Sequence, residues 1–212
     1  GVALIGITVS PTRGYRSPLL GIYDDRFIPG LRELVEICHT HGVKVYAQMG
    51  VGYAWSFDGK PVELVSPSGI CVTDHIDPPF LLGGPPRGTS SSRRELKEHE
   101  ILHMIEAYGD GARRARQIGF DAVELLSGVG YLTGQFMSPL TNKRTDRYGG
   151  SFENRMRFLL EAVKNVRRKA GSDYTIMARF SGQFMEDGFT LDDIKRLSQM
   201  LESAGVQALD IT

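Results

Sequence analysis

Residues 119–150 read GFDAVELLSGVGYLTGQFMSPLTNKRTDRYGG and join a short apolar run to a long, polar connection. The run at residues 120–126 is mostly apolar, and it is bounded by Gly119 before it and by Ser127 and Gly128 after it. Short apolar runs between turn residues are typical of strands that are buried on both faces. This stretch therefore predicts a buried strand.

The connection after this strand shows no helical periodicity until Ser151, and it carries many polar side chains. Loops longer than about 12–15 residues in a compact domain are usually functional or disordered. Several apolar side chains that could anchor the loop argue against disorder; they are Leu132, Phe136, Met137 and Leu140. We therefore expect an ordered, functional loop.

The rest of the chain alternates between strand and helix patterns. Further strands are predicted at residues 2–9, 43–49, 174–180 and 206–211, and helices at residues 28–38, 95–118, 151–168 and 190–204. Residues 50–93 are irregular and rich in Gly, Pro and Ser, with apolar runs that could pair as a small hairpin. Strict alternation predicts a parallel sheet with helices outside it, either in a (β/α)₈ barrel or in an open doubly wound sheet.

The composition excludes several classes of protein. Lys plus Arg and Asp plus Glu are balanced at 25 each, so no net charge favours nucleic acid or an anionic membrane as a partner. The two cysteines, Cys38 and Cys71, are too few for a disulfide framework or a zinc site, and they indicate reduced thiols in a cytoplasmic protein. No apolar run approaches the roughly 18 residues that a membrane span needs.

The motif His99-Glu100-Ile101-Leu102-His103 matches the HExxH pattern of zinc proteases on a predicted helix. At about 100° per residue, both histidines point away from the apolar stripe of that helix. A zinc site needs a third ligand and a cleft, and an outward helix face offers neither. We therefore expect no metal site.

The glycines at 128, 130 and 134 follow a predicted strand, as in a dinucleotide-binding turn. Their spacing is G-x-G-x-x-x-G, which is looser than the fingerprint, and a long loop stands where the helix should begin. The indication of a dinucleotide site is therefore weak.

Three polar residues stand at or just after the ends of predicted strands: Gln48, Arg179 and Tyr131. Ligands bind at the carboxyl ends of strands in parallel α/β folds. Arg179 is costly to bury unless it meets an anionic or polar group, which is either a ligand or a carboxylate such as Glu124. Gln48 could equally cap a loop, and Tyr131 could be an ordinary core tyrosine.

Several motifs resemble the flavin-binding barrels of the old yellow enzyme (NADH:flavin oxidoreductase) family. They are the GYL, QF, SPLTNKRTD, RYGGS and ENR-RF segments of residues 119–158, together with GVALI…VSP…RGY, GIYDD, VYAQM, PRG…RREL and ARFSGQFMEDG. The resemblance covers most of the chain. It implies a (β/α)₈ TIM barrel that binds FMN, is reduced by NADH or NADPH, and passes hydride to the activated C=C of an unsaturated carbonyl compound or enoyl thioester.

The resemblance also assigns roles to the three polar residues. Gln48 stands at the position of the glutamine that pairs with the flavin ring. Arg179 stands at the position of the strand arginine whose charge stabilises reduced flavin. Tyr131 stands at the position of the proton donor, and a tyrosine with a pKa near 10 keeps its proton at neutral pH.

The chain departs from the family pattern where many relatives read HGAHGYL or HGANGYL, because it reads Leu126-Ser127-Gly128-Val129-Gly130-Tyr131-Leu132. Leu126 and Val129 replace the two side chains that donate hydrogen bonds to the substrate carbonyl oxygen. Losing one such donor costs about 3–4 kcal/mol of transition-state stabilisation. The 2,4-dienoyl-CoA reductase branch also lacks this pair, so the chain resembles that branch most.

Placed on the family barrel, residues 1–212 form a partial FMN-binding domain with about the second to the sixth strands. The chain begins and ends on predicted strands, so we expect a fragment. An iron–sulfur cluster would belong only to a missing C-terminal part. Two alternatives to an ene-reductase remain: a flavin-dependent dehydrogenase or demethylase that acts on another substrate, and a catalytically impaired flavin-binding or interaction protein of the same family. The sequence gives no indication of the oligomeric state.

Overall fold

The computed structural model describes residues 1–10, 20–51, 54–55, 63–70, 93–128, 131–182 and 189–212. In chain order its elements are β1 (Val2–Thr8), β2 (Leu20–Gly21), the 3-10 helix η1 (Asp25–Phe27), α1 (Ile28–Thr40), β3 (Lys44–Gly50), β4 (Ala54–Trp55), β5 (Glu63–Ser66), β6 (Arg94–Glu95), α2 (Glu98–Ile118), β7 (Ala122–Ser127), α3 (Leu132–Met137), α4 (Phe152–Ala170), β8 (Thr175–Phe180), α5 (Leu191–Ser203) and β9 (Ala208–Ile211). The predicted strands and helices are therefore confirmed.

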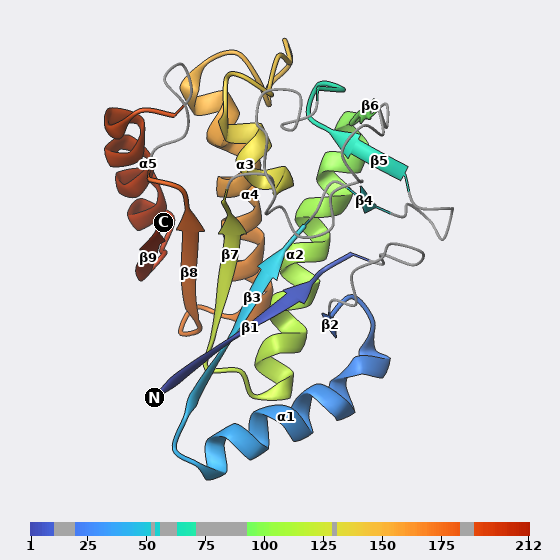
Figure 1. The fold of residues 1–212 in the computed structure, drawn as a ribbon, viewed down its shortest axis with the longest axis vertical. Helices are drawn as coiled ribbons and strands as arrows, with labels where there is room; N and C mark the ends of the chain where they lie inside the picture. The colour runs from blue at the N-terminus through green and yellow to red at the C-terminus, as the bar shows by residue number, and fades with distance from the viewer. Residues whose placement is uncertain (11–19, 52–53, 56–62, 71–92, 129–130, 183–188) are drawn as a thin grey trace.

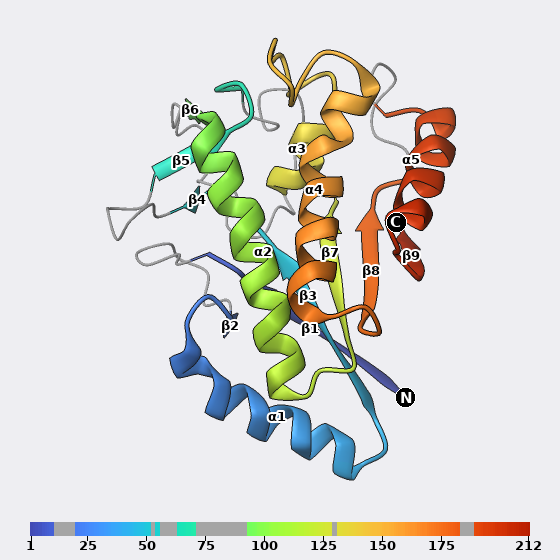
Figure 2. The same cartoon turned by 180° about the vertical axis from the view of Figure 1, so that it is seen from behind.

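Within the described residues, the main sheet has the strand order β2-β1-β3-β7-β8-β9, and every neighbouring pair is parallel. From β1 onward this order follows the chain without a reversal. The helices follow the same order, because α1 packs on α2, α2 on α4, and α4 on α5 (Figure 2). A doubly wound sheet reverses its strand order and carries helices on both faces. The chain is instead wound in one direction, as a segment of a barrel is.

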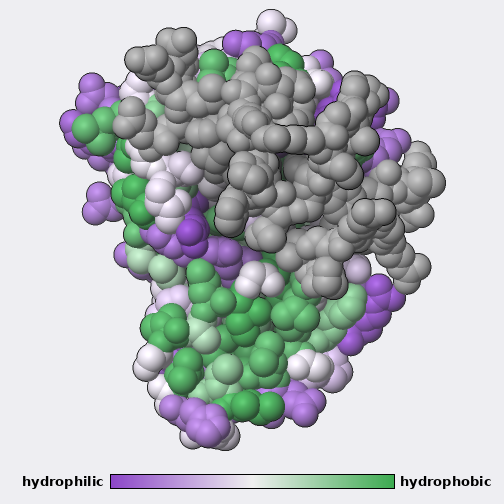
Figure 3. All heavy atoms as spheres, viewed as in Figure 1, coloured by the Kyte–Doolittle hydropathy of each residue, from purple (hydrophilic) through white to green (hydrophobic). Residues whose placement is uncertain are grey.

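The two faces of the sheet differ in their surroundings. Side chains that face α2 and α4 are fully buried, among them Ala47, Met49, Val123 and Ala178. The opposite face is turned toward the viewer in Figure 1, and none of the described helices crosses it. Figure 3 shows an apolar area on the lower half of this face, to which Val2 and Leu4 contribute with exposed fractions of 60% and 42%. This face corresponds to the interior of a barrel.

The helix ends follow the capping signals in the sequence. Ser151 accepts a hydrogen bond from the N–H of Asn154 at the start of α4, and Thr190 forms a capping box with Asp193 at the start of α5. Gly119 ends α2 with a φ of 110°, a conformation that a side chain would strain. Because each helix ends at a defined residue, the strand that follows it also begins at a defined residue. This determines which polar residues lie at the carboxyl ends of the strands.

Two details of residues 50–150 refine the sequence prediction. β4 and β5 pair antiparallel, which confirms the predicted small hairpin, and β6 pairs with β5 in parallel. The prediction of no helix before Ser151 is wrong, because α3 forms immediately after Tyr131. Cys71 lies outside the described residues.

His99 and His103 are exposed on α2, as their spacing predicted. In the described part of the chain, no group of three or more His, Cys, Asp or Glu side chains is placed to bind a metal ion. Among the described helices, none has the length and apolar character needed to cross a bilayer.

Candidate active site

The strand register brings Gln48, Glu124 and Arg179 onto one face of the sheet, close to its carboxyl edge. Gln48 is paired with Glu124, and Leu126, two residues further along β7, is paired with Arg179. Paired residues and residues two positions apart share a face of a sheet. The face is the one that no helix covers (Figure 1). Two of the three polar residues singled out in the sequence, Gln48 and Arg179, therefore lie on one surface.

Gln48 is held by a hydrogen bond to a buried carboxyl group. Its Nε2 atom donates to Oε1 of Glu124 over 2.7 Å. Glu124 is only 1% exposed. Burial raises the pKa of Glu124 and the charge of Asp210 raises it further, while the Gln48 hydrogen bond and the charge of Arg179 oppose the increase. This hydrogen bond uses an N–H of the Gln48 amide, so the carbonyl oxygen of the amide does not take part in it.

Arg179 forms an ion pair with Asp210 on the neighbouring strand β9. Its Nη1 atom lies 3.4 Å from Oδ2 of Asp210, and the two residues are paired in the register. The sequence had suggested Glu124 as the carboxylate partner, and the structure assigns that role to Asp210. The side chains of Arg179 and Asp210 are 32% and 33% exposed, so the ion pair is only partly buried.

Tyr131 stands at the N-terminus of α3, just beyond the end of β7. The helix is fixed to the sheet edge by a hydrogen bond from the N–H of Leu132 to the carbonyl oxygen of Val51. Burial raises the pKa of Tyr131, and the charge of Arg179 opposes the increase. The hydroxyl group therefore keeps its proton at neutral pH and lies within the electrostatic reach of Arg179.

Glycines keep the space around Tyr131 and Gln48 open. A Cβ atom at Gly50 would lie 3.5 Å from Cε1 of Tyr131 and 3.4 Å from Cδ2 of Leu126, so the tyrosine ring lies directly beside this glycine. Gly6 is paired with Gln48, and a Cβ atom added there would meet no atom within 4 Å. A flat ring system with a donor and acceptor edge fits these described residues, since it needs an amide, a cation and a surface lined by small residues.

Of the two residues that replace the expected carbonyl-binding pair, Leu126 is described by the structure and Val129 is not. Leu126 is 7% exposed and lies among Gly50, Gly128 and Tyr131. Its apolar side chain approaches the same two glycines as the ring of Tyr131 and offers no hydrogen bond. Val129 lies outside the described residues.

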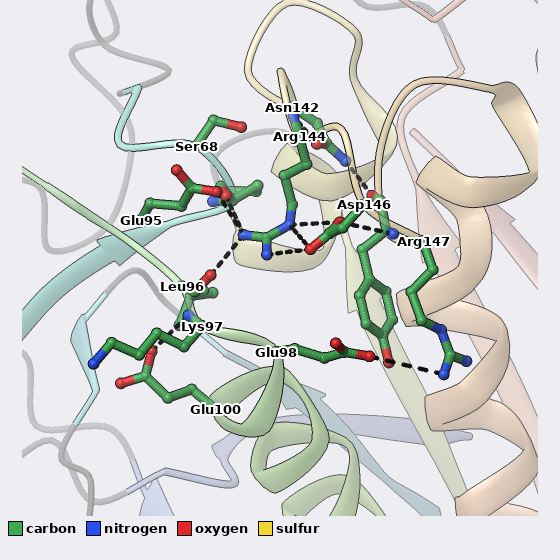
Figure 4. A network of polar contacts seen from close by, with 12 residues as sticks. Ser68, Glu95, Leu96, Lys97, Glu98, Glu100, Asn142, Arg144, Asp146 and Arg147 are labelled. Carbon is green, nitrogen blue, oxygen red and sulfur yellow. Dashed lines mark hydrogen bonds and ion pairs between the residues drawn. The ribbon is translucent and has the colours of Figure 1, made fainter.

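The polar loop after α3 has a role that its sequence did not reveal. Arg144 is 7% exposed, and its guanidinium group donates to the carbonyl oxygens of Pro67 and Leu96, each over 2.6 Å, and to both carboxylate oxygens of Asp146. Nη1 also lies 3.2 Å from Oε1 of Glu95 (Figure 4). These contacts join the β5–β6 segment, the start of α2 and the loop in one polar network.

Asn142 holds the loop from within. Its Nδ2 atom donates to the carbonyl oxygens of Phe136 and Tyr148, each over 2.7 Å, and its Oδ1 atom accepts from the N–H of Arg144. Asp146 also accepts from the N–H of Tyr148. The dense polar motif that dominates the sequence is therefore mainly structural, since its side chains bind the backbone of the protein itself.

A groove of about 550 Å³ lies elsewhere. It runs between α4 and α5, with Leu160, Lys164, Arg196 and Met200 among its lining residues. None of the lining residues is on the open face of the sheet. We therefore place the candidate site at the sheet edge, where the polar groups converge.

Sequence reasoning missed the roles of Glu124 and Asp210. Both carry a signal that could have revealed them, because each is an acidic residue inside a mostly apolar predicted strand. Each also faces the same side of the sheet as the candidate site residue on the neighbouring strand. Only the register shows that Glu124 faces Gln48 and that Asp210 faces Arg179.

Comparison with solved structures supports the fold. A 2-naphthoyl-CoA reductase in complex with 2-naphthoyl-CoA aligns with all of this chain and 32% of its own, with a TM-score of 0.83 and 30% identity. An old yellow enzyme homologue from Zymomonas mobilis aligns with 99% of this chain and 59% of its own, with a TM-score of 0.80 and 23% identity. The chain thus has the fold of part of a TIM barrel, as the sequence predicted.

Comparison with characterised sequences places the chain in a family. An NADH oxidase of Thermoanaerobacter brockii is 40% identical over 196 residues, which are 91% of this chain and 28% of that protein. An NADPH dehydrogenase of Halalkalibacterium halodurans is 35% identical over 213 residues, 99% of this chain and 57% of that protein. This chain therefore spans only part of the length of each relative. Residues 3–211 match the NADH:flavin oxidoreductase / NADH oxidase family, and the chain belongs to that family.

Proposed function

We propose that residues 1–212 form part of an FMN-binding domain in an NAD(P)H-dependent oxidoreductase that transfers hydride to the activated C=C of an unsaturated carbonyl compound or enoyl thioester. The observation that carries this proposal is the convergence of Gln48, Arg179 and Tyr131 around one glycine-lined surface at the carboxyl edge of the sheet. Membership of a flavin oxidoreductase family supports the cofactor.

FMN, when bound, would supply the hydride-transfer chemistry, with NADH or NADPH as the reductant. Gln48 would hold the donor and acceptor edge of the ring system with its carbonyl oxygen and its remaining N–H. Arg179 would place a fixed positive charge beside the ring, where reduction adds negative charge. Because Asp210 neutralises part of that charge, the Arg179–Asp210 pair sets how strongly reduction is favoured.

Tyr131 supplies the proton that completes the reduction. Its hydroxyl group is half-buried and its pKa is raised by burial, so it holds a proton that it can deliver to the α-carbon of the substrate. The ring is held beside Gly50 and Leu126, at the end of the strand that precedes it. This position leaves the tyrosine next to the same surface that Gln48 and Arg179 face.

The proposed substrate class follows from Leu126. This apolar side chain stands where a donor to the substrate carbonyl would be expected, and we propose the same for Val129. A simple enone would then lack a partner for its oxygen. An acyl-CoA thioester can be held through the rest of its structure, as in the 2,4-dienoyl-CoA reductase-like branch. The similarity to a 2-naphthoyl-CoA reductase supports a thioester.

The test of this proposal is a rapid-mixing experiment without oxygen. The FMN-loaded protein is reduced with NADH or NADPH and then mixed with a 2-enoyl-CoA or with 2-cyclohexenone, while flavin absorbance is followed. We expect the thioester to reoxidise the flavin faster than the enone. Faster reoxidation by the enone would contradict the thioester preference. Bound flavin that neither alkene reoxidises would favour the alternative, a flavin-binding protein without ene-reductase activity.

A further inference from the structure

Glu124 is a buried carboxyl group to which the proposed reaction assigns no role. It is 1% exposed and lies in the middle of β7, paired with Gln48 on β3 and with Met177 on β8. Burying a carboxyl group is costly unless its oxygens are paired. An apolar side chain at this position, like that of Met177 beside it, would avoid this cost.

The polar contacts of Glu124 point to one neighbour. Within the described residues, its hydrogen bond comes from Nε2 of Gln48 over 2.7 Å. The charged groups that act on it are Arg179 on β8 and Asp210 on β9, and these two form an ion pair with each other. The carboxyl group therefore directs its strongest contact at the amide of Gln48.

This contact determines which atoms Gln48 can offer to a ligand. An amide has one acceptor oxygen and two N–H groups, and the group of Gln48 that meets Glu124 is an N–H. The N–H that points to Glu124 therefore turns the carbonyl oxygen of Gln48 away from the carboxyl group. The amide is left with one acceptor and one donor for a ligand on the open face. Without Glu124 the amide could rotate or exchange its two ends.

We propose that Glu124 is a positioning residue that fixes the orientation of the Gln48 amide and thereby strengthens binding of the flavin ring. This inference rests on the proposed function, because it assumes that Gln48 contacts FMN. Glu124 itself acts through Gln48 and not through contact with the cofactor. Its contribution should consequently disappear when the Gln48 amide is removed.

A double-mutant cycle tests this dependence. FMN dissociation constants are measured by visible absorbance for the unchanged protein, Glu124→Leu, Gln48→Ala and the double variant, and the unfolding midpoint of each is recorded. We expect Glu124→Leu to weaken FMN binding about tenfold when Gln48 is present, the size expected for a hydrogen bond to a carboxyl group. In the Gln48→Ala background we expect the same change to weaken binding less than about twofold.

Two further variants separate positioning from stability. Glu124→Gln keeps an acceptor atom and should hold FMN within about threefold of the unchanged protein. Asp121→Asn removes a carboxylate at the opposite end of the same strand and should lower stability without changing FMN affinity. Equal weakening by Glu124→Leu in both backgrounds, or equal weakening by Glu124→Gln and Glu124→Leu, would overturn the inference.

The failure of the proposed function looks different. If the unchanged protein binds no FMN, or if Gln48→Ala binds it with unchanged affinity, then the assignment of Gln48 as a flavin contact is wrong, and the positioning role falls with it. If Gln48→Ala weakens binding but shows no coupling to Glu124, only the positioning role is wrong.

Discussion

Nε2 of Gln48 lies 2.7 Å from Oε1 of Glu124, although the two residues are 76 positions apart in the chain. The parallel register of β3 and β7 places them opposite each other, and burial keeps competing water away from the contact. The amide is therefore oriented before any ligand arrives. Such preorganisation lowers the cost of binding, because less side-chain freedom remains to be lost.

The first prediction concerns the proton of Tyr131. Tyr131→Phe removes the hydroxyl group but keeps the ring beside Gly50 and Leu126. We expect reoxidation of the reduced flavin by an enoyl thioester to slow by about 10²-fold or more, the usual size of a general-acid contribution. Flavin reduction by NAD(P)H should remain within about twofold, since it needs no proton from this residue. Equal slowing of both half-reactions in rapid mixing would contradict the assigned role.

The second prediction concerns the charge pair beside the proposed ring site. Arg179→Gln removes a positive charge and should make the flavin harder to reduce, by roughly 30 mV or about 1.4 kcal/mol for two electrons. Asp210→Asn should shift the midpoint potential in the opposite direction, because it leaves Arg179 unpaired. The matched control is Arg116→Gln, whose ion pair with Asp173 lies at the other end of the sheet. Midpoint potentials that move in the same direction in both site variants would sink this account.

The third prediction concerns the structural role of Arg144. Arg144→Ala leaves the carbonyl oxygens of Pro67 and Leu96 without this donor and removes the ion pair with Asp146, which keeps its hydrogen bond from the N–H of Tyr148. Leaving a buried carbonyl oxygen without its hydrogen bond costs about 1–3 kcal/mol, and two such oxygens lose their donor here. Urea unfolding measures the loss. Arg147→Ala is the control, since that side chain is 49% exposed and its ion pair with Glu161 should contribute less than about 1 kcal/mol. Similar losses in the two variants would argue against a structural role specific to Arg144.

The fourth prediction concerns acid stability. Burial alone would raise the pKa of Asp121, but hydrogen bonds from Lys44, from the N–H of Val45 and from His39 lower it to about 2. Since the pKa is lower in the folded state than the ordinary value of 3.8, the carboxylate stabilises the fold above that value. Its contribution of about 2 kcal/mol is lost as the pH falls from about 4 through 2.

Asp121→Asn removes this titration. The free energy of unfolding, measured in urea at pH values from neutral down to about 3, should fall less steeply on acidification in the variant than in the unchanged protein. At neutral pH the variant should be the less stable of the two. An identical acid dependence would show that the ion pair of Lys44 with Asp121 does not stabilise the fold.

Much of the fold is predictable from local patterns. The strands and long helices have clear periodicities and capping residues such as Ser151 and Thr190, so their positions follow from residues close in sequence. The helix α3 is different, because it has six residues and five of them are buried. A helix this short, with almost no exposed face, shows no alternation of apolar and polar residues at helical spacing. Its sequence therefore does not predict it.

The site was predictable only in part. Gln48, Arg179 and Tyr131 are polar residues at strand ends, and the resemblance to a family assigned them roles. Their partners Glu124 and Asp210 depend on the strand register, which pairs segments far apart in the chain. The strand order also settled what periodicity left open, since a barrel segment and a doubly wound sheet have the same alternation of elements.

The polar loop shows a further limit. Arg144 and Asn142 belong to the loop that the sequence predicted to be ordered and functional. The structure shows them donating to carbonyl oxygens of Pro67, Leu96, Phe136 and Tyr148. Composition alone cannot separate side chains that bind a ligand from side chains that bind the backbone of their own protein.

The most direct test of the account is a titration of the protein with FMN, followed by visible absorbance, in the unchanged chain and in a Gln48→Ala/Arg179→Gln double variant. The account predicts a saturable change in the flavin spectrum, and affinity weakened by about 10²-fold in the double variant, since two polar contacts are lost. Equal affinity in the two proteins, or no spectral change in the unchanged protein, would contradict the claim that this face of the sheet binds flavin.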